Sequence, residues 1–298
     1  MILFYGEGRL GNQVFQYQAL CAMAKDRETI VAAGLENLPE FFEISRSRLR
    51  ILTRDKSIKR AIKYVLIPFI VRPAARALRL LNYAFEPMVQ IDGRAEPGGD
   101  ITLKRGLLRC LTFVDGGHYQ NPSLWPAVFS AATLPLRASV RNAARSLLTT
   151  IQSAPEPLSF VHVRRGDYLN YKPYGVSELC LPIEFYRAAI VELRRRVGKT
   201  HLLFITDDPQ WVNEQLGDIP HKTVLSNDAL MDFAIMTECK NGIISNSTFS
   251  LAAALVMPDP GIVIAPEYWF GFRMRTWYPP QIRCIHQKLL YLRVQASS

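Results

Sequence analysis

The sequence predicts an α/β protein with two Rossmann-like domains, each built on a parallel, doubly wound sheet. Three observations predict this fold. Short apolar runs alternate with stretches of helical periodicity along the chain. Polar residues gather directly after the apolar runs, where open α/β sheets bind their ligands. A proline-containing segment at 153–157 interrupts the alternation in a chain of 298 residues, which predicts domains at 1–155 and 156–298.

The first domain begins with a buried strand at 1–5, followed by a glycine-rich turn. Apolar residues at helical spacing predict a helix over 12–25, and 29–33 predicts a second strand. Residues 44–97 are interpreted as a basic helical insertion, because eleven lysines and arginines between Arg46 and Arg79 face the single acidic residue Asp55. A further helix is predicted at 138–151.

The second domain shows the alternation most clearly. Strands are predicted at 158–163, 201–205, 222–225, 242–245 and 261–265, and helices at 182–197, 209–216, 228–238 and 249–257. Strands that alternate with helices in this way indicate a parallel sheet with helices on both faces.

A net charge of +10 and a pI of about 9.5 favour a polyanionic partner such as nucleic acid, an anionic membrane or a phosphorylated ligand. The basic stretch from Arg46 to Arg79 has two interpretations: a solvated helical face, or a docking face for anionic lipid or a lipid-diphosphate acceptor. The apolar run 64–71 within it is too short to cross a bilayer. Of these partners a phosphorylated ligand is predicted, and nucleic acid is not.

Five cysteines without metal-ligand spacing predict reduced thiols, and the first residues lack the pattern of a secretion signal. Both features predict a cytoplasmic protein. The basic stretch suggests a second possibility, a peripheral position at the inner face of the plasma membrane.

The opening turn carries Gly6, Gly8 and Gly11 in the G-x-G-x-x-G spacing of dinucleotide-binding proteins. A nicotinamide site also needs an acidic residue about 20 positions later, at the end of the second strand. Glu28 precedes that strand and Glu36 lies beyond the expected spacing. An NAD-dependent oxidoreductase is therefore the weaker alternative.

His162, Arg164, Arg165 and Asp167 directly follow the predicted strand 158–163. Arginine pairs bidentately with phosphate, so one of the two guanidinium groups is expected to neutralise a diphosphate. The structural alternative is an Arg–Asp ion pair that fixes the turn.

Asp207 and Asp208 follow the next strand, but adjacent residues on an extended chain point to opposite faces. Asp208 is predicted to cap the helix that Pro209 begins, and Asp207 to contact a ligand or His162. No metal site is predicted. Ser245, Asn246, Ser247 and Thr248 stand before an apolar helix, where hydroxyls and free N–H groups bind anions or simply cap the helix.

Three motifs in this order resemble glycosyltransferase family 11, the α-1,2-fucosyltransferases, here of the bacterial type. They are Gly8-Arg-Leu-Gly-Asn-Gln13, His162-Val-Arg-Arg-Gly-Asp-Tyr168, and the stretch from Asp232 through Cys239 to Ile244-Ser-Asn-Ser-Thr-Phe-Ser250. The resemblance spans roughly residues 1–257. It implies a two-domain GT-B fold with a cleft between the domains, GDP-β-L-fucose as donor, inversion at the anomeric carbon and no metal or other cofactor.

The resemblance also implies roles for individual residues. Arg165 would stabilise the departing GDP. Apart from the resemblance, Asp167 is either a candidate general base or a residue that orients Arg165 or His162, and all three are predicted to belong to the catalytic group. The donor-binding set would be Gly8, Arg9, Gly11, Asn12, Gln13, Arg164, Asp207, Asp232, Ser245, Asn246, Ser247, Thr248 and Phe249. Leu251 and Ala252 depart from the family, which commonly has two tryptophans there.

The expected reaction is transfer of fucose to the 2-hydroxyl of a terminal galactose or similar sugar. The acceptor would be an oligosaccharide or a lipid-linked glycan of lipopolysaccharide type. A fucosyltransferase of other linkage, such as α-1,6, another GDP-sugar transferase, and a non-catalytic carbohydrate- or membrane-binding protein are the alternatives.

Overall fold

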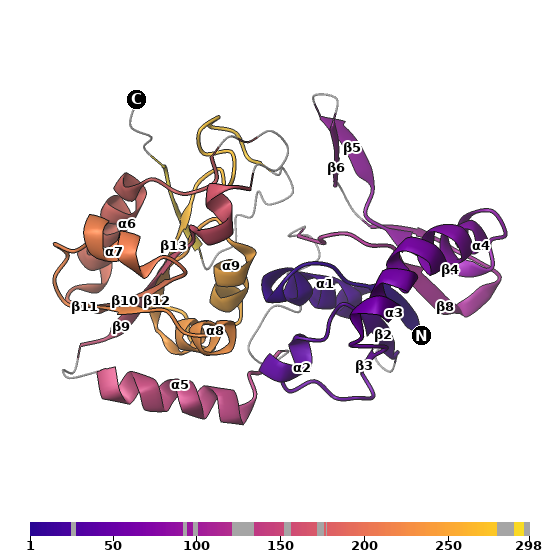
Figure 1. Cartoon of the computed structure of the whole chain (residues 1–298), viewed down its shortest axis with the longest axis horizontal. Helices are drawn as coiled ribbons and strands as arrows, with labels where there is room; N and C mark the ends of the chain where they lie inside the picture. Colours follow the sequence, from indigo (N-terminus) through magenta and orange to yellow (C-terminus); the bar gives the residue numbers. More distant parts are fainter. Residues whose placement is uncertain are drawn as a thin grey trace. The chain divides into compact units, whose positions relative to one another are not determined.

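The computed structural model describes residues 1–24, 28–91, 94–97, 101–120, 134–151, 156–171, 176, 178–278 and 289–294. The chain divides into two compact units, Met1–Phe129 (unit 1) and Ser130–Ser298 (unit 2). Helix α5 (Ala138–Ile151) lies in unit 2, whereas the sequence places it in the first domain. It packs along α8 (Ala229–Glu238) (Figure 1). Arg145 of α5 pairs with Glu238 at 2.6 Å. Most of the predicted linker 153–157 lies outside the described residues.

Unit 1 contains a sheet in the order β3-β2-β1-β8-β4-β7. Its strands are β1 (Ile2–Tyr5), β2 (Ile30–Ala33), β3 (Leu49–Ile51), β4 (Leu81–Phe85), β7 (Thr102–Lys104) and β8 (Leu108–Val114). All neighbours pair in parallel except β4 and β7. Helix α1 (Leu10–Met23) follows β1, the short α2 (Leu38–Phe41) follows β2, and β5 (Met88–Ile91) and β6 (Arg94–Pro97) form a separate hairpin.

The helical part of the predicted insertion 44–97 is shorter than expected. It consists of α3 (Lys56–Ala61), the wide helix η1 (Ile62–Val71) and α4 (Arg72–Arg76), whereas β3 and β4 on either side belong to the sheet. In β3, Leu49 is buried and Arg50 is exposed, so the arginines alternate with apolar residues at the two-residue period of a strand. The high density of arginine obscures that period in the sequence.

Proline explains why η1 is a π-helix rather than an α-helix. Pro68 lies inside it, has no N–H to donate, and its ring clashes with the carbonyl four residues earlier in an ordinary helix. The wider turn avoids that clash, and at its end the N–H of Arg72 donates to the carbonyl of Ile67, five residues back. Ile67 and Ala75 anchor this helical segment by packing against Tyr83 and Phe113 of the sheet.

Unit 2 contains a fully parallel sheet in the order β11-β10-β9-β12-β13-β14. The strands are β9 (Leu158–Val163), β10 (His201–Thr206), β11 (Lys222–Leu225), β12 (Asn241–Ile243), β13 (Val263–Pro266) and β14 (Leu289–Leu292). The chain therefore builds the sheet outward from β9 in one direction and then from β12 in the other. The strand order reverses between β9 and β12, which is where doubly wound sheets bind ligands.

The helices of unit 2 are α5, α6 (Ile183–Val197), α7 (Pro209–Gln215), α8 and α9 (Thr248–Leu255), with a short 3₁₀ helix η3 (Gly166–Leu169) after β9. The core contains Phe185 and Leu193 of α6 packed with Val161, Phe204 and Ile243 of the central strands. These observations confirm the prediction of an α/β protein with two parallel sheets, apart from the antiparallel edge strand β7 of unit 1.

Candidate active site

The polar residues of unit 2 meet at the point where its strand order reverses. His162 lies in β9 and Ser245 follows β12, and the Nδ1 atom of His162 is 2.9 Å from the hydroxyl of Ser245. Both side chains are buried. Burial, with a further contribution from the charge of Arg164, lowers the pKa of His162 to about 3. The imidazole is therefore neutral at physiological pH and joins the two strands, which favours a positioning role over proton transfer.

Arg164 is held between two carboxylates. Its Nη1 atom is 2.6 Å from Asp207, its Nη2 atom donates to Asp167, and its guanidinium lies over the ring of Tyr168. The sequence left open whether an Arg–Asp pair fixes this turn, and the structure shows that the pair forms between Arg164 and Asp167. Asp207 also accepts the backbone N–H of Arg165 at 2.9 Å, so it binds the arginine stretch rather than His162.

Arg165 has a different environment. Its Nε atom donates to Asp208 at 3.0 Å and its guanidinium lies 4.3 Å from the ring centroid of Trp211. Asp208 also accepts the N–H of Trp211, which confirms the prediction that it caps α7. A guanidinium has two further nitrogen donors beyond Nε, arranged as a fork that matches a phosphate. Arg165 is thus positioned through one edge while the other edge can receive an anion.

The segment after β12 turns sharply into α9. Ser245 and Asn246 are fully buried, and Asn246 donates from Nδ2 to the carbonyl of Leu179 at 2.8 Å. The hydroxyl of Tyr168 donates to the carbonyl of Asn246 at 3.2 Å. These two residues therefore connect the turn to the segment that follows β9.

Ser247 caps α9 by accepting the N–H of Phe249, so the capping interpretation is correct for this hydroxyl. Thr248 is the first residue of the helix. The Phe249 ring packs against His162 and Phe233, with centroid distances of 5.8 and 5.5 Å. Phe249 is thus a packing residue in this structure, whereas Ser247 and Thr248 lie at the positive end of a helix dipole.

Asp232 lies in the first turn of α8, almost fully buried. Its Oδ1 atom accepts from the side chain of Asn227 at 3.0 Å and from the backbone N–H of Asn227 at 3.3 Å. Burial raises the pKa of Asp232 to about 6, and the bonds from Asn227 oppose that shift. Among the described residues, Asn227 alone donates hydrogen bonds to this buried carboxylate. Asp232 is therefore suited to accept further hydrogen bonds from a ligand.

Asp232→Asn is expected to change the pH dependence of stability. The carboxyl pKa is about 3.9 in an unfolded chain and about 6 in the folded protein. The folded state therefore binds this proton more tightly, which stabilises it fully below pH 4, and the stabilisation is lost as pH rises through 6. Relative to the variant, the wild type should lose up to about 3 kcal/mol of unfolding free energy between acid and neutral pH.

Urea denaturation of the two proteins from pH 4 to pH 8 measures this difference. Asp259→Asn, at an exposed surface position, is the control for loss of one negative charge. Parallel stability curves for wild type and Asp232→Asn would contradict the burial-induced shift.

In unit 1 the glycine loop is braced by its own polar residues. Gly8 has a positive φ of 89°, and α1 begins two residues later. Gln13 donates from Nε2 to the carbonyl of Gly8 at 3.2 Å and accepts the N–H of Asn37 at Oε1. Asn12 accepts at Oδ1 from Gln120 at 3.0 Å. The amide side chains therefore hold the loop in place. Contact with the donor substrate stays a prediction for the loop residues Gly8, Arg9, Gly11, Asn12 and Gln13.

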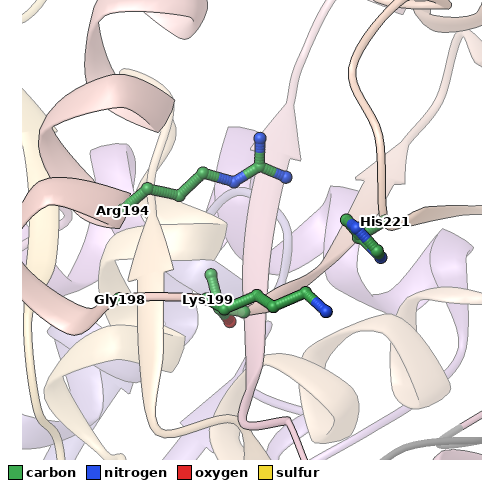
Figure 2. A pocket seen from close by; sticks show the side chains of 5 residues that line it. Arg194, Gly198, Lys199 and His221 are labelled. Carbon is green, nitrogen blue, oxygen red and sulfur yellow. The ribbon is translucent and has the colours of Figure 1, made fainter.

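Each unit contains a pocket. A pocket of about 270 Å³ in unit 1 lies beside the glycine loop and is crossed by ion pairs of Lys63 with Glu7 and of Lys59 with Glu36. A pocket of about 330 Å³ in unit 2 is lined by Arg194, Gly198, Lys199, Thr200 and His221 (Figure 2). It adjoins His201, the first residue of β10, and so lies at the opposite end of that strand from Asp207. The unit 2 pocket is therefore separate from the site around Arg165.

Sequence reasoning missed a second polar group, at the carboxyl edge of the unit 1 sheet. Asp115 follows β8 and accepts from Arg72 at 2.8 Å and from the hydroxyl of Tyr83. Glu86 follows β4, is buried, and accepts the N–H of Tyr119 through Oε2, while its Oε1 atom has no partner among the described residues. Burial raises the pKa of Glu86. The available signal was the run Asp115-Gly-Gly after an apolar stretch.

Among the described residues, no three histidine, cysteine, aspartate or glutamate side chains gather as a metal-binding group. In the same part of the chain, no helix combines the length and apolar character that a membrane span needs.

A family model described as "Glycosyl transferase family 11" matches residues 116–275, more than half of the chain. The chain belongs to glycosyl transferase family 11. It is therefore a glycosyltransferase, as the motifs predict. The matched range contains the arginine stretch and the turn into α9, whereas the glycine loop lies outside it.

Relatives of this family 11 chain include both bacterial and animal proteins. It is 30% identical to the O-antigen biosynthesis glycosyltransferase WbnK of Escherichia coli over 116 residues, which is 37% of this chain and 38% of WbnK. It is 24% identical to galactoside 2-alpha-L-fucosyltransferase SEC1 of Bos taurus over 92% of this chain and 69% of that protein. The mouse galactoside alpha-(1,2)-fucosyltransferase 2 is 24% identical over 87% of this chain and 69% of its own length.

Solved structures resemble the family 11 chain in fold. POFUT1 in complex with GDP matches with a TM-score of 0.52 at 14% identity, covering 89% of this chain and 97% of POFUT1. The NodZ alpha-1,6-fucosyltransferase soaked with GDP-fucose matches with a TM-score of 0.50 at 14% identity, covering 86% of this chain and 92% of NodZ. Together with the two parallel sheets, these likenesses confirm the GT-B-like fold class.

Proposed function

We propose that this protein transfers L-fucose from GDP-β-L-fucose to the 2-hydroxyl of a terminal galactose or similar sugar, with inversion and without a metal ion. The observation that carries the proposal is the placement of Arg165 at the strand-order reversal of unit 2, fixed through Nε with its remaining donors unused by Asp208. The relatives named as galactoside α-1,2-fucosyltransferases, which match nearly the whole chain, support the choice of sugar and linkage.

The chemistry required is neutralisation of a departing diphosphate. As the bond between the fucose anomeric carbon and the phosphate oxygen breaks, negative charge develops on GDP and positive charge on the sugar. A preorganised guanidinium and a helix N-terminus stabilise that negative charge without reorganisation. Arg165 and the first turn of α9, with Ser247 and Thr248, supply these two elements at the edge of one sheet. Arginine and helix dipole together would perform the role that a divalent cation performs in metal-dependent transferases.

The other residues predicted to bind GDP-fucose differ in their surroundings, and we propose different roles for them. Asp232 offers a buried carboxylate for hydrogen-bond donors of the nucleotide. Arg164, Asp207, His162 and Ser245 hold one another and the backbone of Arg165, so we propose that they position the arginine. We propose that Asp167 acts as the general base that takes the proton from the attacking hydroxyl of the acceptor sugar. The alternative is a structural role, in which Asp167 only pairs with Arg164.

The acceptor proposed is a terminal galactoside, either on a free oligosaccharide or on a lipid-linked glycan. The name of WbnK, an O-antigen biosynthesis glycosyltransferase, supports a lipopolysaccharide-type acceptor. A fucosyltransferase of α-1,6 linkage is the second candidate. NodZ shares the fold, and fold alone does not choose between the two linkages.

The proposed function is tested by incubating the protein with GDP-fucose and a panel of galactosides, with and without EDTA. We expect a fucosylated product whose linkage is α-1,2 by NMR, and a rate unchanged by EDTA, because no step requires a metal. Activity that is lost in EDTA and restored by Mn²⁺ would contradict metal independence. An α-1,6 product would contradict the linkage alone.

Thermal shift with GDP and with NAD separates a transferase from an oxidoreductase. A ligand present at 100 times its Kd adds about 2.7 kcal/mol to the unfolding free energy. GDP is expected to stabilise the protein and NAD to leave it unchanged.

A further inference from the structure

One face of the helical segment in unit 1 is apolar and exposed to solvent. Its side chains are between 40% and 74% exposed, and the set is Ile58, Tyr64, Val65, Leu66, Phe69 and Ile70. We call this set the η1 face, since five of its six members lie on η1. Ile67 is the one fully buried residue of η1, and Ile62 and Val71 at its two ends pack partly buried against the same cluster. The other apolar side chains of the helix are largely exposed to solvent. Exposed apolar side chains gathered in one place indicate an interaction surface.

A second exposed apolar group continues from the end of this segment. Leu78 and Leu80 follow α4, and hydrogen bonds link this stretch to the β7–β8 connection. The N–H of Leu107 donates to the carbonyl of Arg79 at 2.8 Å, and that of Leu108 to the carbonyl of Leu80 at 2.7 Å. All four leucines are exposed, as is Leu103 in β7. We call these five residues the leucine corner.

The charged residues around both groups are mostly basic. From residue 44 to residue 85 the chain holds eleven basic residues and one acidic residue, Asp55, which is used to cap α3. Lys104 and Arg105 stand between the leucines of the corner without an intervening acid. Lys56, Arg60, Lys104 and Arg105 are exposed and form no ion pair with a described carboxylate. An anionic partner is therefore favoured over a neutral or basic one.

We propose that the η1 face and the leucine corner dock unit 1 on a membrane surface that contains anionic lipid. A helix with apolar and aromatic side chains beside lysine and arginine lies in the headgroup region of a bilayer, where the apolar groups are buried and the cations meet lipid phosphates. Tyr64 and Phe69 are side chains suited to that interface, and Pro68 keeps them on a wide turn. The excess of positive charge favours a lipid surface over a second copy of the same face, because two such faces would repel each other.

The same helical segment also lines the unit 1 pocket, through two of its lysines. Lys59 and Lys63 extend from α3 and η1 to Glu36 and Glu7, which line that pocket beside the glycine loop. Docking of the exposed face would therefore hold the pocket close to the bilayer. This inference does not depend on which sugar is transferred.

Vesicle co-sedimentation tests the proposal. We expect the protein to bind phosphatidylcholine vesicles that contain phosphatidylglycerol, to bind pure phosphatidylcholine weakly, and to release as salt is raised. The double variant Phe69→Asp, Ile70→Asp should reduce binding about tenfold or more, because each apolar side chain contributes on the order of 1.5–3 kcal/mol when buried. Val191→Asp, at a side chain 68% exposed on α6 of unit 2, is the matched control and should bind normally.

The charge contribution is tested with Lys56→Glu, Arg60→Glu, which should weaken binding to anionic vesicles and flatten its salt dependence. Circular dichroism and thermal melting check that each variant folds, which is expected because the altered side chains are exposed. Equal binding to neutral and anionic vesicles, or full binding by the Phe69→Asp, Ile70→Asp variant, would overturn the proposal. A dimer in solution that this variant dissociates would also overturn it, by assigning the face to a second copy.

Discussion

Arg165→Ala is expected to lower kcat for fucosyl transfer by about 10²–10³, with little change in folding. Removal of one preorganised donor from a site that stabilises a developing anion has this effect in other enzymes. The proposed function places that anion on the departing GDP. Arg165 is the arginine of the pair with donors to spare, because Asp208 uses only its Nε atom. Steady-state kinetics with GDP-fucose and a galactoside acceptor measure the loss.

Two variants separate this role from a structural one. Arg187→Ala removes an arginine of unit 2 that pairs with Asp218 on the surface, and it should leave kcat unchanged. Arg165→Lys keeps the charge but loses the planar fork, so its kcat should lie between those of the wild type and the alanine variant. The Arg165 side chain also packs on Trp211, and melting curves check that its removal leaves unit 2 folded. Near-normal kcat in a folded Arg165→Ala protein would refute the assignment.

The structure distinguishes two arginines that the sequence presents as equals. Arg164 and Arg165 are adjacent, and nothing local tells which one faces a ligand. The distinction arises from residues more than 40 positions away, since Asp207 engages Arg164 and Asp208 engages Arg165. Such pairings depend on β9 and β10 lying side by side, which no local pattern reports. The resemblance to family 11 favours Arg165, and the geometry agrees with that choice.

The fold of unit 2 was predictable for a physical reason. A strand in the middle of a parallel sheet is covered on both faces, so it is apolar throughout, and all six residues of β9 are buried. Helix α6 carries the amphipathic period of a helix on one side of a sheet. The order of the strands was not predictable, because parallel strands are joined through long connections and either neighbour is possible.

Unit 1 was harder to predict because its strands are short and some are rich in arginine. β3 has three residues, and its polar neighbours suggested a helix. Glu86 and Asp115 could not be predicted as site residues, because each follows a strand that was not predicted from the sequence. A polar residue at a strand end is conspicuous only once the strand is known.

Gly34→Ala is expected to destabilise unit 1 by about 3–4 kcal/mol, which is at the upper end of the range for single substitutions. Gly34 follows β2 with a positive φ of 87°, and an added Cβ would lie 2.0 Å from the carbonyl oxygen of Gly6. Gly6 follows β1 and donates its N–H to the carbonyl of Ala33 at 2.7 Å, so the two backbones cannot move apart without breaking this bond. Gly6, the first glycine of the opening motif, therefore allows the ends of β1 and β2 to approach each other closely.

Gly198→Ala is the matched control, because Gly198 also has a positive φ, of 76°, but no atom lies within 4 Å of its added Cβ. It should cost only the conformational penalty of about 1–3 kcal/mol for a side chain at this positive φ and extended ψ. Hydrogen exchange of the amides in β1 and β2 reports the stability of unit 1 separately from unit 2. Protection should fall in these strands for Gly34→Ala and stay unchanged for Gly198→Ala. Equal destabilisation by both variants would contradict this explanation. It would show that glycine is required at position 34 by the positive φ alone, and not by the close contact with Gly6.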